Sequence, residues 1–188
     1  GYVLFYIMIA FSQIYAKSAP TVSEAGYAMG LGFSPQIFTA LLMFSAVSLA
    51  ITITISGKYI DKVGRRIWLI WTTVGVALFG LVLPYFLENG TTVSLFWFLI
   101  IGMGLIGMGY GPLASFLPEL FPTHARYSGA SLTYNIAGLF GASVAAIIAL
   151  PLNANYGLKG VGIYLTLNAV LSLIGLWFIT ETRDRQLL

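Results

Sequence analysis

Four bases and one acid lie close together in the stretch Gly57-Lys58-Tyr59-Ile60-Asp61-Lys62-Val63-Gly64-Arg65-Arg66. Residues 25–57 and 67–87, on either side, contain no Asp, Glu, Lys or Arg. The carboxylate of Asp61 can pair with a base or cap the N-terminus of a neighbouring helix, and Gly57 and Gly64 allow close approach or a sharp turn. This chemistry suits a reversible, ion-paired latch. The alternative is simple anchoring, because bases at the ends of membrane spans need no other cause.

A second group of ionisable residues lies in the proline-bounded stretch of residues 118–126, which holds Glu119, His124 and Arg126. Glu119 and Arg126 can cap two helices at an interface, or they can join the same gate as Asp61. A lone histidine in a loop is usually only solvated, although it can also carry protons. Elsewhere the apolar stretches offer no cluster of acid, base, nucleophile or metal ligand, so an enzyme and a metal site are not predicted.

The composition indicates a membrane protein. Of the 188 residues, 59% are hydrophobic and 8% are charged, whereas soluble domains carry roughly 25% charged residues. No basic run is interleaved with aromatic residues, so nucleic-acid binding is not expected. The chain begins with Gly1 inside an apolar run, without the features of a signal peptide. We interpret this beginning as a cut through a longer protein.

Six stretches approach the length of about 20 apolar residues that a bilayer-spanning helix needs. They are residues 1–16, 35–56, 67–87, 93–117, 127–150 and 160–180, with Ser34 and Pro35 as a helix start. Seven Lys and Arg residues follow the even-numbered spans, and two follow the odd-numbered spans. Because basic residues stay on the cytoplasmic side, residues 57–66, 118–126 and 181–188 are predicted to be cytoplasmic. The chain is therefore predicted to be an all-α, multi-pass protein of the cell membrane.

Uncharged polar residues are the candidates for a cavity inside the bundle. Tyr6 and Gln13 share one face of the first span, and Tyr134 and Asn135 lie on one face of the fifth. Cavity lining and interhelical hydrogen bonding remain open for these residues. For the stripe Ser45, Ser48, Thr52 and Ser56, interhelical hydrogen bonding is favoured.

The fourth span is rich in glycine and ends near two prolines. Gly107 and Gly111 form a small-x-x-x-small pair that allows close helix contact, and Pro112 favours a bend. These three residues are candidates for a gating hinge, and packing alone is the alternative.

Two sets of motifs resemble a known family. The pattern Gly57-x-x-x-Asp61-x-x-Gly64-Arg65-Arg66 resembles the signature loop of the major facilitator superfamily. A further series is similar to the metabolite:proton symporters, which include proline/betaine, shikimate and dicarboxylate carriers: Gly111-Pro112, Glu119-Leu120-Phe121-Pro122-Thr123, Arg126-Tyr127-Ser128-Gly129, Tyr134-Asn135-Ile136, Phe140-Gly141 and the tail Glu181-Thr182-Arg183. The chain departs from the pattern at Ala142 and Val144-Ala145, where relatives usually have a second Gly and a Pro.

The resemblance implies that residues 1–188 are the C-terminal six-helix half of a twelve-helix transporter, with the N-terminal half absent. It implies secondary transport of a small polar metabolite (an organic acid, amino acid or betaine) by alternating access. The proton gradient is the expected energy source, with no cofactor, and the coupling carboxylate is expected in the absent half. The expected partners are the lipid bilayer, the N-terminal half and a small-molecule substrate, and the full-length protein is expected to be a monomer. A sugar porter, and a non-transporting membrane receptor or scaffold, remain as alternatives.

Overall fold

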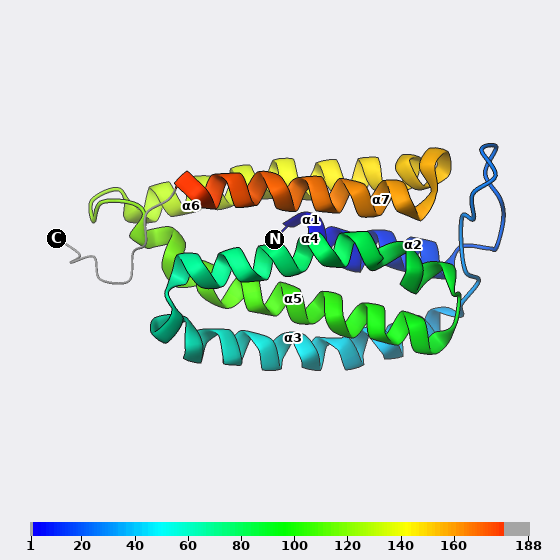
Figure 1. The fold of residues 1–188 in the computed structure, drawn as a ribbon, viewed down its shortest axis with the longest axis horizontal. Coiled ribbons are helices and arrows are strands. Elements are labelled where there is room, and N and C mark those ends of the chain that lie inside the picture. Colours follow the sequence, from blue (N-terminus) through cyan, green and yellow to red (C-terminus); the bar gives the residue numbers. More distant parts are fainter. Residues whose placement is uncertain (1, 179–188) are drawn as a thin grey trace.

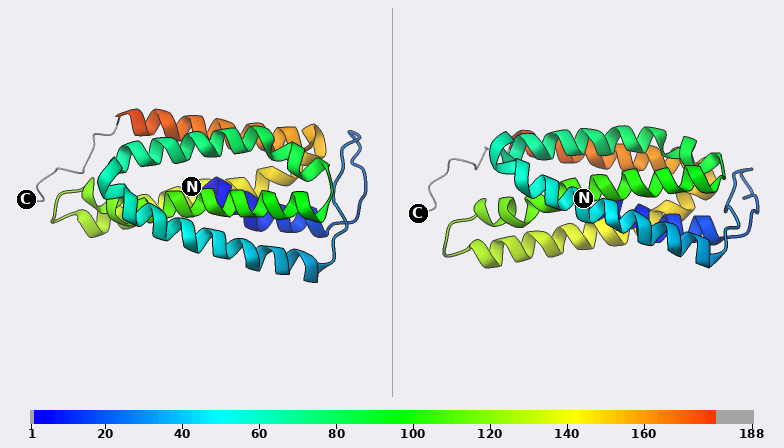
Figure 2. Two further views of the ribbon diagram at one scale, coloured as in Figure 1. Left: turned by 60° about the horizontal axis from the view of Figure 1, so that its bottom comes forward. Right: turned by 90° about the horizontal axis from the view of Figure 1, so that it is seen from below.

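The fold is an elongated bundle of helices that run along its long axis (Figures 1 and 2). The structure, a computed structural model, describes residues 2–178, apart from the side chains of residues 61, 114, 115 and 146. Within this part the regular structure is helical, and the one β-bridge joins Val22 to Ala28. The predicted all-α class is confirmed. The elements in chain order are α1 (Tyr2–Tyr6), η1 (Ile7–Phe11), α2 (Ser12–Lys17), α3 (Pro35–Val63), α4 (Arg65–Glu88), α5 (Thr92–Glu119), α6 (Arg126–Gly138), η2 (Leu139–Ser143) and α7 (Val144–Phe178).

Four helical segments within residues 2–178 are long and apolar enough to cross a membrane: Pro35–Ile60, Arg65–Glu88, Thr92–Glu119 and Arg126–Phe178. Tyr2–Lys17 is a shorter apolar helix. The last long segment has two arms, so the described part of each of the six predicted stretches lies on a helical stretch of its own. At the start of α3, the Ser34 side chain accepts a hydrogen bond from the backbone N–H of Ile37.

The charged stretch at residues 57–66 is mostly helix rather than the loop that its composition predicted. Helix α3 continues to Val63, and α4 begins at Arg65, so Gly64 alone connects the two helices. Gly64 has a φ of 102°, a conformation that only glycine adopts readily. A connection of one residue is therefore sufficient, and the lysines of the stretch lie on the last turns of α3.

The predicted connection at residues 151–159 is also shorter than expected. Helix α7 continues through Pro151 and changes direction only at Gly157, where φ is 68° and ψ is −172°. The two arms on either side of Gly157 run back along each other (Figure 1). The ring of Tyr27 lies directly over this glycine, 2.6 Å from the position of a Cβ atom. A left-handed φ and a close aromatic neighbour both require glycine here.

Two tight helix pairs organise the bundle. Helix α3 packs along α5, and α4 packs against α7 and α5. In the first pair Ser48 donates to the carbonyl of Ile100 over 3.0 Å, as the interhelical interpretation of the serine stripe predicted. In the second pair Gly80 and Gly162 bring the two backbones together, and Thr166 donates to the carbonyl of Ala77 over 3.0 Å. Small residues at both crossings allow this approach.

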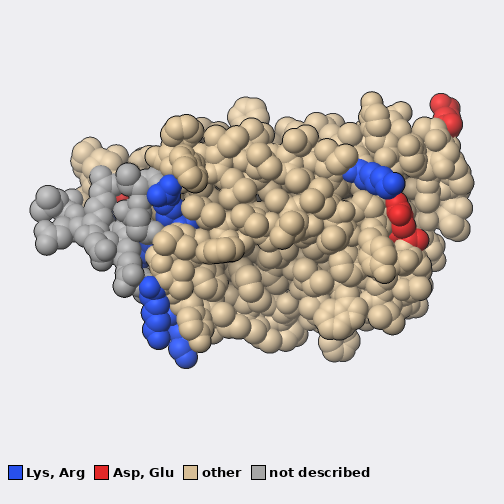
Figure 3. Space-filling view, in the orientation of Figure 1, with Lys and Arg blue, Asp and Glu red and all other residues tan. Residues whose placement is uncertain are grey.

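The loop of residues 18–34 is held against the end of the bundle that carries Gly157, by hydrogen bonds from and to residues near this glycine. Buried Asn153 donates to the carbonyl of Ala28 over 3.0 Å, and Ser23 donates to the carbonyl of Ala154 over 2.7 Å. Charged side chains visible in Figure 3 lie toward the two ends of the molecule and leave the long middle of that face uncharged. We call the end that carries Gly64, Glu119 and Arg126 the basic end.

Candidate functional site

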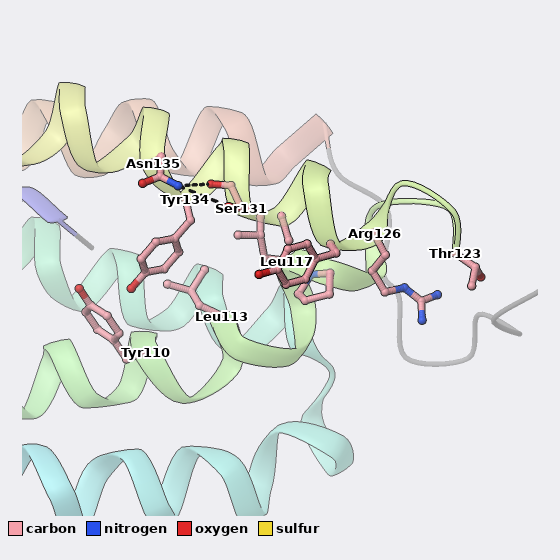
Figure 4. A pocket seen from close by; sticks show the side chains of 11 residues that line it. Tyr110, Leu113, Leu117, Thr123, Arg126, Ser131, Tyr134 and Asn135 are labelled. Atoms are coloured by element: carbon pink, nitrogen blue, oxygen red, sulfur yellow. Dashed lines mark hydrogen bonds between the residues drawn. The ribbon is translucent and has the colours of Figure 1, made fainter.

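A cavity of about 680 Å³ lies between α5 and α6. Helix α5 contributes Tyr110, Leu113, Leu117 and Pro118; α6 and the preceding turn contribute Thr123, Arg126, Tyr127, Ala130, Ser131, Tyr134 and Asn135. Figure 4 shows the hydroxyl groups of Tyr110 and Tyr134 directed toward each other across the cavity. The volume is in the range of small-molecule sites, and the mixture of apolar walls with a few polar groups is typical of them.

The polar part of this cavity lies deep in the bundle. Tyr134 is eight residues after Arg126, the first residue of α6, and Tyr110 is nine residues before Glu119, the last residue of α5. At 1.5 Å per residue these side chains lie about 12–14 Å from the basic end of their helices. Helix α5 has 28 residues, so Tyr110 lies about 7 Å from the centre of the helix, toward the basic end.

Five aromatic side chains form one cluster beside the cavity, and we call them the aromatic cluster: Tyr2, Phe5 and Tyr6 from α1, Tyr110 from α5 and Tyr134 from α6. The ring centroids of Tyr2 and Tyr134 are 5.3 Å apart with an interplanar angle of 72°. Those of Phe5 and Tyr110 are 6.2 Å apart at 52°. Three helices are thus joined at this depth by aromatic contacts.

A second cavity, of about 490 Å³, lies on the other side of Tyr110 and reaches α1, α4 and α7. Two of the three helical stretches that form the aromatic cluster continue into a π-helical segment: η1 begins directly after Tyr6, and η2 begins five residues after Tyr134. The second segment covers Ala142, where the sequence departs from the family pattern. Such segments are rare and are frequent at functional sites.

The structure brings together some of the predicted cavity residues. Tyr134 and Asn135 line the larger cavity, and Asn135 donates to the carbonyl of Ser131 over 2.8 Å. Tyr6 joins the aromatic cluster through Phe5, with ring centroids 5.8 Å apart. Neither Tyr6 nor Gln13 lines either cavity, and Gln13 is exposed; the π-helical segment η1 lies between these two residues.

Tyr110 lines both cavities but was not a candidate in the sequence analysis. It lies between Gly109 and Gly111, in a stretch whose dominant pattern is that of small residues. The signal in the sequence was a tyrosine between two glycines. Gly107 and Gly111 lie on the face that packs against α3, so the large tyrosine ring must lie on a different face of α5.

At the basic end, side chains of α4 connect three helices. Arg65 forms an ion pair with Glu119 of α5, and the two side chains are only 18% and 14% exposed. Arg66 donates to the carbonyls of Leu176 and Trp177 in α7 over 3.0 and 2.9 Å. The indole of Trp68 donates to the carbonyl of Met108 over 2.9 Å. The first turn of α4 is therefore fastened to both α5 and α7.

The helix dipoles make the pairing of Arg65 with Glu119 favourable. Arg65 lies at the N-terminus of α4 and Glu119 at the C-terminus of α5, so each charge faces the helix end that disfavours it. Their pairing offsets both effects. Arg66, in contrast, contacts carbonyls of the last described turn of α7, where a cation is favoured.

The other charged residues singled out in the sequence are not part of this contact between α4, α5 and α7. Arg126 begins α6 and lies at the mouth of the larger cavity, where its guanidinium points away from Tyr110 and Tyr134 (Figure 4). The Nε atom of Arg126 is buried without a hydrogen-bond partner among the described residues. The side chain of Asp61 and the tail at residues 181–188 lie outside the described residues. The latch role of Asp61 therefore stays a prediction.

The candidate hinge residues lie in an unbroken helix. Helix α5 runs from Thr92 to Glu119 with Pro112 in its interior. A Cβ atom at Gly107 would lie 2.5 Å from the carbonyl oxygen of Leu49 in α3, and one at Gly111 would meet the hydroxyl of Ser56. These glycines have a packing role in the structure, and their hinge role stays a prediction.

The sequence of the chain is similar to those of known transport proteins. The family model described as "Sugar (and other) transporter" matches residues 26–188. One relative is a Haemophilus influenzae protein that is provisionally named a metabolite transport protein. It is 91% identical over 187 residues, which are 100% of this chain and 42% of that protein. The Escherichia coli "Inner membrane metabolite transport protein YhjE" is 39% identical over 99% of this chain and 41% of its own length. The Salmonella typhimurium "Proline/betaine transporter" is 32% identical over 71% of this chain and 27% of its own length.

No solved structure matches the chain. The chain spans about 42% of the length of the Haemophilus relative that it matches over its whole extent. The family model covers most of the chain, and two relatives above 30% identity are matched over nearly all of it. The chain therefore belongs to the sugar (and other) transporter family of the major facilitator superfamily.

Proposed function

We propose that this chain is the C-terminal half of a secondary transporter that moves a small polar metabolite across the cell membrane. The observation that carries the proposal is a cavity of about 680 Å³ between α5 and α6 that extends from the basic end to the aromatic cluster inside the bundle. Alternating access needs a binding site near the middle of the bilayer and a closure between that site and each surface. The names of the relatives support transport of metabolites.

The closure on one side is assigned to the ion pair of Arg65 with Glu119 and to the contacts of Arg66 with α7. Five described bases, Lys58, Lys62, Arg65, Arg66 and Arg126, belong to this end, and Lys17 and Lys159 belong to the opposite end. This asymmetry supports a cytoplasmic basic end. Single cysteines at exposed Lys62 and Glu24, in a cysteine-free background, test it with an impermeant maleimide on intact cells. Labelling at position 62 but not at position 24 would reverse the proposed orientation.

Proton coupling is part of the proposal, and this chain places limits on it. None of the six spans contains Asp, Glu, Lys, Arg or His, since these residues are absent from residues 1–16, 25–57, 67–87, 89–118, 127–158 and 160–180. A proton-carrying group at mid-depth is therefore assigned to the N-terminal half of the transporter. In this scheme the present half supplies the substrate cavity and the closure at the basic end.

Uptake into proteoliposomes tests the transport function. The full-length protein is reconstituted, and accumulation of labelled organic acids, amino acids, betaines and sugars is measured with and without an imposed inward proton gradient. Uptake of a metabolite that a protonophore abolishes is the expected result. Uptake that does not respond to the gradient would remove proton coupling. Absence of uptake and of counterflow for the whole panel would favour a non-transporting receptor or scaffold.

A sugar porter is the second candidate, because the matching family is described as "Sugar (and other) transporter". Aromatic rings and amide groups, such as Tyr134 and Asn135, also occur in sugar sites. Competition by sugars, with no competition by amino acids, acids or betaines, would establish it.

A further inference from the structure

We propose that the smaller cavity, of about 490 Å³, is filled in the full-length transporter by a helix that continues α1 toward the basic end. This helix would be formed by the residues that precede position 1. The inference rests on the proposed function, in which this chain is the C-terminal half of a longer protein. It names the occupant of a cavity that the proposed substrate site does not use. The chain spans 42% of the Haemophilus influenzae relative, so a full-length protein of that size has the residues to fill this space.

The first step is the position of α1 within the bundle. The apolar helix Tyr2–Lys17 has 16 residues, whereas α3 and α5 have 29 and 28. Tyr2 packs on Gly141, where a Cβ atom would lie 2.9 Å from the Cβ of Tyr2. Gly141 comes 15 residues after Arg126, the first residue of α6, so Tyr2 lies about 22 Å inside the basic end. Helix α1 therefore begins in the interior of the bundle (Figures 1 and 2).

The second step is that a helix cannot begin at this depth without a cost. The first four backbone N–H groups of a helix have no acceptor within it. The hydrocarbon core of a bilayer holds no water that could accept these hydrogen bonds. Carbonyl groups of a preceding helical turn satisfy them directly, so α1 is expected to continue along its own axis toward the basic end.

The third step is that the smaller cavity lies where this continuation would run. Tyr2 and Leu4 of α1 belong to its lining. Along α7 the cavity extends from Leu165 to Leu176, which is 11 residues or about 16 Å. The carbonyl of Leu176 accepts the hydrogen bond from Arg66 at the basic end. The cavity thus occupies the space between the beginning of α1 and the basic end.

The fourth step is that the helices around this space leave room for another helix. The two arms of α7 separate from Gly157 onward, so α6 and the last turns of α7 lie apart at the basic end (Figure 2). Helix α6 contains no buried residue. Ala137 of α6 and Ser172 of α7 both line the cavity and are both exposed. A helix between α6 and α7 would cover these two residues.

The fifth step is that the wall of the cavity suits an apolar neighbour. None of the described residues that line it is charged. Its hydroxyl and amide donors, tyrosines aside, each donate to the carbonyl four residues earlier in the same helix, over 2.7–3.0 Å: Thr72, Thr73, Thr133, Asn168 and Ser172. The hydroxyl of Tyr110 is directed toward the larger cavity (Figure 4). A polar solute would find few free donors on this wall, whereas an apolar helix keeps its backbone hydrogen bonds internal.

The geometry sets the length and character of the segment. A distance of about 16–22 Å corresponds to about 11–15 helical residues. Together with Tyr2–Lys17 they would form a helix as long as α3. These residues should be apolar or small, and the first charged residue should lie at the basic end. The sequence of the full-length protein checks this directly, because a charged residue in the two turns before Gly1 would contradict the inference.

Cysteine cross-linking of the full-length protein tests the placement. In a background without other cysteines, Ala137→Cys or Ser172→Cys is combined with one cysteine at each position over about three helical turns before Gly1. Disulfides should form with a period of three to four residues, and the partners of the two sites should fall on different faces of the segment. A disulfide requires Cα atoms closer than about 7 Å. Leu171→Cys is the matched control, because Leu171 is 66% exposed, lines neither cavity and should form no disulfide.

Three results would overturn the inference. The first is a set of disulfides without helical period, and the second is equal cross-linking of Leu171→Cys and Ser172→Cys. The third is Ser172→Cys that forms no disulfide with the segment but reacts with a maleimide carried on a lipid acyl chain, which would assign the cavity to lipid. Normal uptake without the expected disulfides would leave the proposed function standing. Expected disulfides in a protein that transports nothing would remove the proposed function and keep the inference.

Discussion

Replacing Gly107 with alanine should loosen the contact between α3 and α5. A Cβ atom at position 107 would lie 2.5 Å from the carbonyl oxygen of Leu49 and 3.1 Å from the amide nitrogen of Ile53, and it would also meet the hydroxyl of Thr52. Two of these three atoms belong to the backbone of α3. A rotamer change in one side chain therefore cannot make room, and the two helices must move apart.

The size of the effect can be isolated with a second glycine of the same helix. At Gly109 the nearest atom to a Cβ would be Cγ2 of Thr72 at 3.8 Å, which is an ordinary contact. Both substitutions raise helix propensity equally, by up to about 1 kcal/mol. Overpacking costs about 1–3 kcal/mol and applies to Gly107 alone. The free energy of unfolding of Gly107→Ala should therefore be about 1–3 kcal/mol below that of Gly109→Ala.

The measurement is a denaturant titration of both variants of the full-length protein in mixed micelles, together with uptake in proteoliposomes. A difference in unfolding free energy of less than about 0.5 kcal/mol would refute the packing argument, since that is the range of surface substitutions. Reduced uptake by Gly107→Ala at unchanged stability would instead support the gating hinge that the sequence suggested.

Three further predictions concern the ends of the bundle. Glu119→Gln removes the negative charge that pairs with Arg65. A hydrogen bond between charged groups contributes about 1.5–3 kcal/mol, so the basic end should open up to about 10- to 150-fold more often. A cysteine introduced in the cavity by Ser131→Cys should then react with a thiol reagent faster when Glu119→Gln is also present. An unchanged labelling rate would contradict the latch, and so would the same acceleration with the exposed control Lys58→Gln. Gly157→Ala should lower the unfolding free energy by about 1–3 kcal/mol, because φ is 68° and Tyr27 occupies the Cβ position, whereas Gly175→Ala, with no atom within 4 Å, should not. Asp61→Asn should slow transport while membrane insertion, followed by the amount of protein in the membrane fraction, stays normal; uptake at the normal rate would exclude its role.

The helices were predictable from the sequence because their cause is local. A run of apolar residues between charged positions needs no knowledge of its neighbours, and the start of α3 at Ser34 and Pro35 follows from capping alone. The ends were less predictable. Single glycines with positive φ, Gly64 and Gly157, make connections of one residue possible, and the sequence does not reveal how few residues a turn will use.

The candidate site was predictable only in part. Tyr134 and Asn135 were identified because helical spacing places them on one face, and the structure puts them on the cavity wall. Gln13 was placed by the same rule, which fails where the π-helical segment η1 interrupts the 3.6-residue period. Tyr110 depends on packing between α1, α5 and α6, and such a contact cannot be read from the period of any one helix.

The two hydrogen bonds from Arg66 to α7 have a consequence for the order in which the protein is assembled. Their acceptors, the carbonyls of Leu176 and Trp177, lie 110 and 111 residues later in the chain. At a synthesis rate of about 5–20 residues per second, α4 exists for roughly 5–20 s before its partner is made. During that time the N–H groups of Arg66 that donate to α7 need other acceptors, such as water or lipid headgroups at the membrane surface. The first turn of α4 can therefore reach its final position only when the last helix arrives, and a ribosome that stalls before α7 leaves this corner of the bundle unfinished.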